Sequence, residues 1–136
     1  MFKFTNVANA TASGEVVTFD RARSSTYTPV GTNDTNLSGL TFYTAFWVRV
    51  GDVIYVAGAF DADAVATGAT SFELSLPVAS NFTAATEAAG GAWCSGAERA
   101  FAVSANVAND RAYFLATLQN TAVQTFSFCF SYRVLP

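Results

Sequence analysis

Apolar and polar residues alternate with a period of two along most of the chain, and this pattern predicts β-strands. In the segment 41–50, one strand face would carry Phe42, Thr44, Phe46, Val48 and Val50, and the other Tyr43, Ala45, Trp47 and Arg49. Gly51 and Asp52 follow, and the segment 53–60 is again strand-like. Because glycine suits the first central position of a type II′ turn, the sequence predicts a tight hairpin over Val48–Val56.

A second hairpin is predicted near the end of the chain, where Phe101–Val107 and Ala112–Leu118 alternate around the turn residues Asn109 and Asp110. The last predicted strand spans about Val123–Val134. One of its faces would carry Phe126, Phe128, Phe130, Tyr132 and Val134, and the other Thr125, Ser127, Cys129, Ser131 and Arg133. Such an aromatic stripe must be covered by a second sheet or by another subunit.

Further strands are expected at Glu15–Phe19, Ser25–Val30, Ser71–Leu76 and Ala92–Ser95, whereas Val78–Ala89 has the character of a loop. About eight or nine short strands at regular spacing are typical of an all-β fold. We therefore expect residues 25–136 to form a single antiparallel β-sandwich or jelly roll.

Residues 1–24 differ from the rest, because Asn6–Gly14 is small and polar with no periodic pattern. We expect an N-terminal arm that orders on binding another molecule, since Phe2, Phe4 and Phe19 would be a liability in a free tail. The alternative is a frayed terminus with one edge strand.

Composition narrows the function classes. Of the 136 residues, 51% are hydrophobic and only 12% are charged, so much of the surface must consist of small neutral residues, which suits contact with other proteins. The net charge is −3 and the positive residues are dispersed, so neither nucleic acid nor anionic lipid is an expected partner. The sequence predicts no secretory signal and no membrane span, so we expect synthesis in a cytoplasm.

The absence of histidine removes the Ser-His-Asp and Cys-His arrangements and the common zinc sites. Asp61 and Asp63 offer too few ligands for a calcium loop and are interpreted as turn or edge-strand residues. Nothing selects a glycosidase pair from Glu73, Glu87 and Glu98. We expect no enzyme activity, no metal and no cofactor.

The aromatic residues Trp47, Trp93, Tyr27, Tyr43 and Tyr55 suit either a sugar-stacking platform or a core and protein interface. We favour a protein interface on the face that carries Tyr43, Trp47 and Arg49.

Cys94 and Cys129 are too sparse to form a disulfide framework. Cys129 lies in an apolar run and is predicted to be a buried thiol. Whether the two cysteines pair stays open at this point.

Several segments resemble a known domain. They are Thr26-Tyr27-Thr28-Pro29 through Arg49-Val50-Gly51-Asp52, Gly58 with Asp61 and Asp63, Ser75-Leu76-Pro77-Val78-Ala79-Ser80-Asn81-Phe82, Ala108-Asn109-Asp110-Arg111 and the closing Phe-rich strand. Together, over about residues 25 to 134, they resemble a β-domain that recurs in virion proteins of tailed bacteriophages, in tail-fibre-like chains and capsid decoration (cement) proteins. These turn-and-strand motifs are moderately specific for the fold and weakly specific for a role.

The resemblance implies a phage particle protein that forms a homotrimer. A small domain with a short arm suits a decoration protein on the exterior of the head, bound to the major capsid protein lattice. Its expected interface residues are Phe2, Phe4, Phe19, Tyr43, Trp47 and Arg49. The alternative is a tail-tip or fibre-tip module that recognises a host-surface glycan through exposed Trp and Tyr. A hydrolase that uses unrecognised carboxylates is the least favoured hypothesis.

Overall fold

The computed structural model describes residues 22–96 and 100–136, which form ten antiparallel strands and one short 3₁₀ turn. The elements are β1 (Ala22–Tyr27), β2 (Gly31–Thr35), β3 (Leu37–Phe42), β4 (Ala45–Val50), β5 (Val53–Ala64), β6 (Gly68–Leu74), η1 (Ala85–Glu87), β7 (Ala88–Trp93), β8 (Phe101–Asn106), β9 (Arg111–Leu118) and β10 (Gln124–Arg133). The all-β, antiparallel class predicted from the sequence is confirmed.

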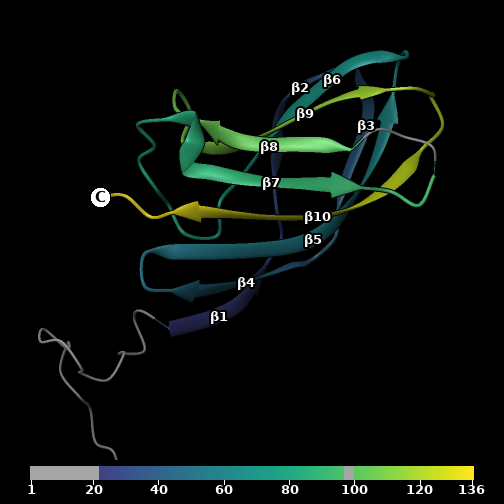
Figure 1. The fold of residues 1–136 in the computed structure, drawn as a ribbon. Coiled ribbons are helices and arrows are strands. Elements are labelled where there is room, and N and C mark those ends of the chain that lie inside the picture. Colours follow the sequence, from purple (N-terminus) through teal and green to yellow (C-terminus); the bar gives the residue numbers. More distant parts are fainter. Residues whose placement is uncertain (1–21, 97–99) are drawn as a thin grey trace, which may run out of the picture.

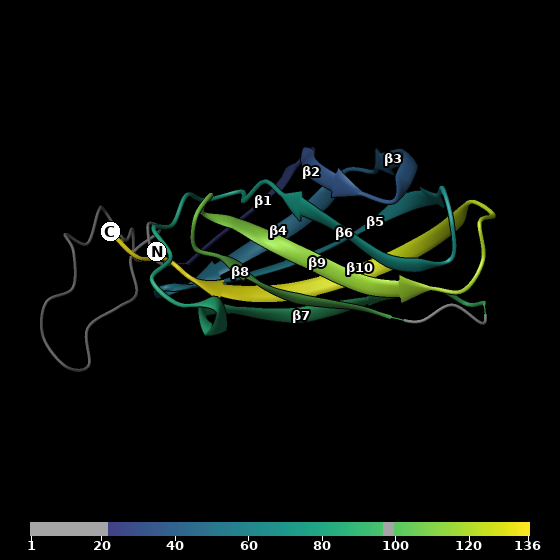
Figure 2. The same cartoon turned by 90° about the horizontal axis from the view of Figure 1, so that it is seen from above.

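All ten strands belong to one sheet, in the order β1-β4-β5-β10-β7-β8-β9-β6-β2, and β3 pairs with the far half of β5 (Figure 1). We expected the two packed sheets of a sandwich, and the structure instead has a single, strongly curled sheet that resembles half of a barrel. The view from above shows β2 and β3 lying over β5 and β6 at one side of the curl (Figure 2).

The curl is held by phenylalanine side chains on the inner face of the sheet. Three strands separate β5 from β9 in the sheet, yet the rings of Phe60 and Phe114 meet edge to face with centroids 6.0 Å apart. Phe60 also meets Phe72 of β6 at 5.0 Å. Other rings that contact Phe60 are those of Phe42, Phe101, Phe126 and Phe128. Edge-to-face and offset ring pairs add to the free energy of apolar burial, so this cluster stabilises the curled form over a flat sheet.

The chain crosses from one side of the curl to the other at Asn36, between β2 and β3. Asn36 has a positive φ of 62°, a conformation that asparagine tolerates better than most residues. Its side-chain amide donates to the carbonyl of Ala66 (2.7 Å) and to Oγ1 of Thr70 (2.9 Å), and its Oδ1 accepts from the Ala66 amide (3.0 Å). These bonds fix β2 on β6 and β3 on β5.

The predicted strand over Thr41–Val50 is two strands, because regular pairing breaks at Tyr43 and Thr44. The break shifts the alternation by one position. Phe42 therefore faces the core, whereas Phe46 is 60% exposed and Trp47 is 5% exposed. Our prediction that Phe42 and Phe46 share a face is wrong for this reason.

The hairpin between β4 and β5 forms where predicted. Gly51 has a positive φ of 61° and Asp52 does not, as a type II′ turn requires. Two other strand predictions need correction: β1 begins at Ala22, inside the predicted arm of residues 1–24, and β2 was not predicted. The strand expected at Glu15–Phe19 lies outside the described residues.

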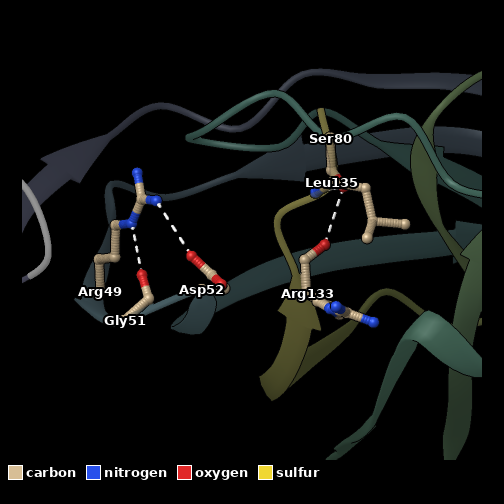
Figure 3. Close-up of polar contacts among 6 residues, drawn as sticks. All are labelled: Arg49, Gly51, Asp52, Ser80, Arg133 and Leu135. Carbon is tan, nitrogen blue, oxygen red and sulfur yellow. Dashed lines mark hydrogen bonds and ion pairs between the residues drawn. The ribbon is translucent and has the colours of Figure 1, made fainter. Parts of the chain in front are cut away.

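Polar bonds fasten the end of the sheet at this hairpin (Figure 3). Arg49 Nε donates to the Gly51 carbonyl (2.8 Å), and the Arg49 guanidinium lies 3.8 Å from a carboxylate oxygen of Asp52. Nearby, Ser80 Oγ donates to the Arg133 carbonyl (2.8 Å) and accepts from the Leu135 amide (3.0 Å). The last residues of the chain are thereby tied to the loop that follows β6.

The aromatic cluster predicts a large difference between two Phe→Ala substitutions. Phe60→Ala should lower the free energy of unfolding by about 3–5 kcal/mol, because it opens a cavity in a fully buried cluster. Phe46→Ala, on the exposed face of the neighbouring strand, should cost about 1 kcal/mol or less. Urea titration of both variants at a dilution that gives monomers would check this, and equal losses would contradict the assigned core.

Candidate interaction surface

Midway along β4, β5, β10, β7, β8 and β9, the outward side chains form uncharged rows, which we call the outer apolar face; the charged residues Asp61, Asp63, Arg111 and Arg133 lie outside these rows. Strand pairing aligns them in two rows. The first row is Phe46, Ala57, Cys129, Gly91, Ala102 and Leu115. The second row is Val48, Tyr55, Ser131, Ala89, Ser104 and Tyr113. A continuous apolar patch of this kind on a single chain marks a contact surface.

Side-chain size gives the outer apolar face its shape. Small residues stand on β10 and β7 and at Ala57 of β5, and the larger Phe46, Val48 and Tyr55 stand to one side of them. Between them lies a groove of about 260 Å³. Phe46, Val48 and Tyr55 form its wall, and Ala57, Ala89 and Cys129 line its floor. Phe46 and Tyr55 are 60% and 52% exposed, so the wall projects into solvent.

Gly90 of β7 is part of the lining of the groove. A Cβ atom at this position would collide with the backbone of β10 at Cys129 and Phe130. Glycine therefore lets β7 pair closely with β10 at this point.

A third row extends the outer apolar face toward the other end of the strands, with Tyr43, Ala59, Ser127 and Trp93. Tyr43 and Trp93 are 48% and 53% exposed. Beyond them the surface becomes polar: Asp61 accepts hydrogen bonds from Thr125 Oγ1 (2.6 Å) and from the Tyr43 hydroxyl (2.7 Å).

These two bonds hold the pKa of the Asp61 carboxyl below its usual range, the Thr125 bond having the larger effect. The same carboxylate raises the pKa of the Tyr43 phenol. Both oxygens of Asp61 are thus engaged by hydroxyl groups, and no cluster of three metal-ligating side chains occurs within residues 22–96 and 100–136.

Two other carboxylates considered from the sequence have local structural roles. Glu73 is buried on β6 and accepts hydrogen bonds from the amides of Asn33 (2.9 Å), Asn106 (2.7 Å) and Asn109 (3.0 Å). Glu87 accepts from the backbone amides of residues 83 and 84 and caps η1. Glu73 therefore fastens β2 and the β8–β9 turn to β6. Glu73 and Glu87 lie in separate hydrogen-bond networks and do not form a pair of facing carboxylates.

The structure separates the residues that we expected to share one interface. Trp47 faces the core, and the Arg23 guanidinium lies 5.6 Å from the centre of its ring. Tyr43 faces outward, and Arg49 is half-buried against the β4–β5 turn. The prediction of a common Tyr43/Trp47/Arg49 face is wrong, because the break before Ala45 turns Trp47 inward. Phe2, Phe4 and Phe19 lie outside the described residues.

Sequence reasoning missed the side chains that do form the outer apolar face, above all Phe46, Val48 and Tyr55. Cys129 was expected to be buried but is exposed, and both it and Cys94 are free thiols. One signal was available: the residues opposite the last aromatic stripe include Ser127, Cys129 and Ser131, which are small and uncharged. A solvated sheet face normally carries charged or long polar side chains instead.

No family model, curated protein or solved structure matched this chain. Within the described part of the chain, no helix has the length and hydropathy needed to cross a bilayer.

The hydrogen bonds at Asp61 predict a pH effect with a defined sign. Because the pKa of Asp61 is lower in the folded protein, the bonds stabilise the fold above the unfolded pKa, and this contribution is lost as pH falls through the folded pKa. Thr125→Val should therefore raise the pKa of Asp61 toward its usual value, and Tyr43→Phe should raise it less. Carboxyl NMR titration would check the order, and an unchanged pKa in Thr125→Val would contradict it.

Proposed function

We propose that this chain is a structural, non-enzymatic subunit that assembles through its outer apolar face, and more specifically a trimeric decoration protein on the head of a tailed bacteriophage. The observation that carries the proposal is the set of uncharged, partly aromatic rows on the outer side of the sheet, which expose Phe46, Val48 and Tyr55 together. Three of the candidate carboxylates, those of Asp61, Glu73 and Glu87, are engaged in local hydrogen bonds.

The two faces of the sheet differ in whether the described residues bury them. The inner face is filled largely by phenylalanines, and no element within residues 22–96 and 100–136 covers the exposed side chains of the outer face. Its exposed apolar area costs free energy in water at about 25 cal/mol per Å². A second protein that covers this face removes that cost, which favours a permanent assembly over a free monomer.

The resemblance to phage virion domains supports the more specific proposal. A subunit that binds the assembled major capsid protein lattice, and not its separate subunits, stabilises the lattice by mass action. Three copies joined by their outer apolar faces would present their remaining surfaces to the capsid exterior. The low charge of the whole chain, 12% of residues, agrees with a protein that meets neighbours over much of its surface.

A matched pair of Val→Asp substitutions tests the assembly. Val48→Asp puts a charge on the wall of the groove and should abolish the trimer, because a buried unpaired carboxylate is costly. Val65→Asp, in the loop after β5 where the valine is 64% exposed against 37% for Val48, should leave it intact. Light scattering coupled to size exclusion would give the mass of each variant. A trimeric Val48→Asp would overturn the proposed surface.

The role on the particle needs a separate measurement. Virions that lack this protein should lose capsid integrity at lower temperature than complete virions, and added wild-type protein should restore it. Equal thermal resistance of the two kinds of particle would contradict a cement role.

A second candidate function, recognition of a host glycan, is favoured by the row that joins Tyr43 and Trp93. Both rings are about half exposed, and Ala59 and Ser127 leave the surface between them low. Trp47 is no longer part of this candidate because it is buried. Saturable glycan binding that is lost in Trp93→Ala would favour the second function over the first.

A further inference from the structure

We infer that the groove on the outer apolar face receives phenylalanine side chains from residues 1–21 of a second copy of this chain. The inference rests on the proposed assembly, and it names the segment that occupies the groove. It follows from where the segment joins the fold, from the turn chemistry of its sequence and from the size and lining of the groove.

The segment joins the fold beside the groove. β1 begins at Ala22, which pairs with Val50 of β4, and two residues further on Ser24 pairs with Val48 of the groove wall. Neighbouring strands lie about 4.8 Å apart, so the start of β1 is within roughly 10 Å of the wall. Residues 1–21, at about 3.3 Å per extended residue, have a reach of about 70 Å. The segment is therefore long enough to extend to a neighbouring copy.

Local sequence argues against a return onto the same copy. A strand that folds back directly before Ala22 needs a tight turn, and such turns favour glycine, asparagine or aspartate at positive φ. Asp20 suits such a conformation, as Asp110 does with a φ of 53°, whereas Arg21 does not. Between Phe19 and Ala22 the chain has only Asp20 and Arg21, and the nearest preceding glycine is Gly14. This turn chemistry favours a second copy, and not the same sheet, as the place where the side chains of Val16–Phe19 bind.

The groove fits an aromatic side chain. Its volume is about 260 Å³, and an enclosed cavity of about 150 Å³ is enough to hold benzene. The wall is apolar, and the Cys129 thiol on the floor offers a favourable sulfur–aromatic contact. The segment supplies Phe2, Phe4 and Phe19, and the small, largely polar residues Asn6–Gly14 separate the first two rings from the third. Each ring can therefore enter such a groove by itself.

Cys129 serves as a built-in reporter of occupancy. In a Cys94→Ser background it is the only thiol, and it is exposed on the floor of the groove. We expect slow alkylation by N-ethylmaleimide in the full chain. The variant Phe2→Ser/Phe4→Ser/Phe19→Ser should react at least about tenfold faster. The control Thr5→Ser/Thr11→Ser/Thr18→Ser, in the same segment, should react as slowly as the parent.

A mixing experiment identifies the source of the segment. The donor is the full chain with Cys94→Ser and Cys129→Ser, which has no thiol but keeps its three phenylalanines. Adding the donor to the fast-reacting triple Phe→Ser variant should slow alkylation of Cys129 in that variant. No slowing, combined with protection of the parent at every dilution, would show that the segment covers its own groove and would overturn the inference.

The oligomeric mass of the same samples distinguishes failure of the proposed trimer from failure of the proposed contact between residues 1–21 and the groove. If the parent and the Phe→Ser variant are both trimers and both react slowly, another surface covers the groove. The inference about residues 1–21 then fails, and the proposed assembly stands. Fast alkylation in a monomeric parent would overturn both.

Discussion

The aromatic contacts of Phe60 across the interior of the curled sheet are the interaction on which the rest of the structure depends. Phe60 lies near the middle of the long strand β5, and its ring meets rings from β6, β8, β9 and β10. A flat sheet would leave these rings apart and exposed, so burying them requires the curl. Once the sheet is curled, one face is a closed core and the other is a broad convex surface that no other part of the described chain covers.

Polar groups at the margins of the sheet link its strands and loops through hydrogen bonds. Asn36 links β2 and β3 to the loop after β5, and Glu73 links β2 and the β8–β9 turn to β6. Both are buried or half-buried groups with several bonds, and loss of one partner would leave polar atoms unsatisfied. These residues determine the path of the chain, whereas the phenylalanines supply much of the apolar surface that is buried in the core.

The sequence alone was sufficient for the strand type, the hairpin at Gly51 and the direction of the aromatic stripe in β10, because all three follow from local period and turn chemistry. It was not sufficient for the single sheet, since the contact of Phe60 with Phe114 depends on distant pairing. The inward position of Trp47 also escaped prediction. A break of two residues at Tyr43 and Thr44 changes the facing of every later residue of the strand, and it carries no glycine or proline to mark it.

The central claim is that the outer apolar face is buried between proteins in the assembled state. Hydroxyl-radical footprinting of the native full chain tests it most directly, with Phe46, Tyr55 and Trp93 as reporters and the exposed loop residues Val65 and Val123 as internal references. We predict that on assembly Phe46 and Tyr55 become strongly protected, Trp93 less so because it lies at one side of the groove, and the two valines stay reactive. Reporters as reactive in the assembled protein as in the dilute monomer would contradict the account.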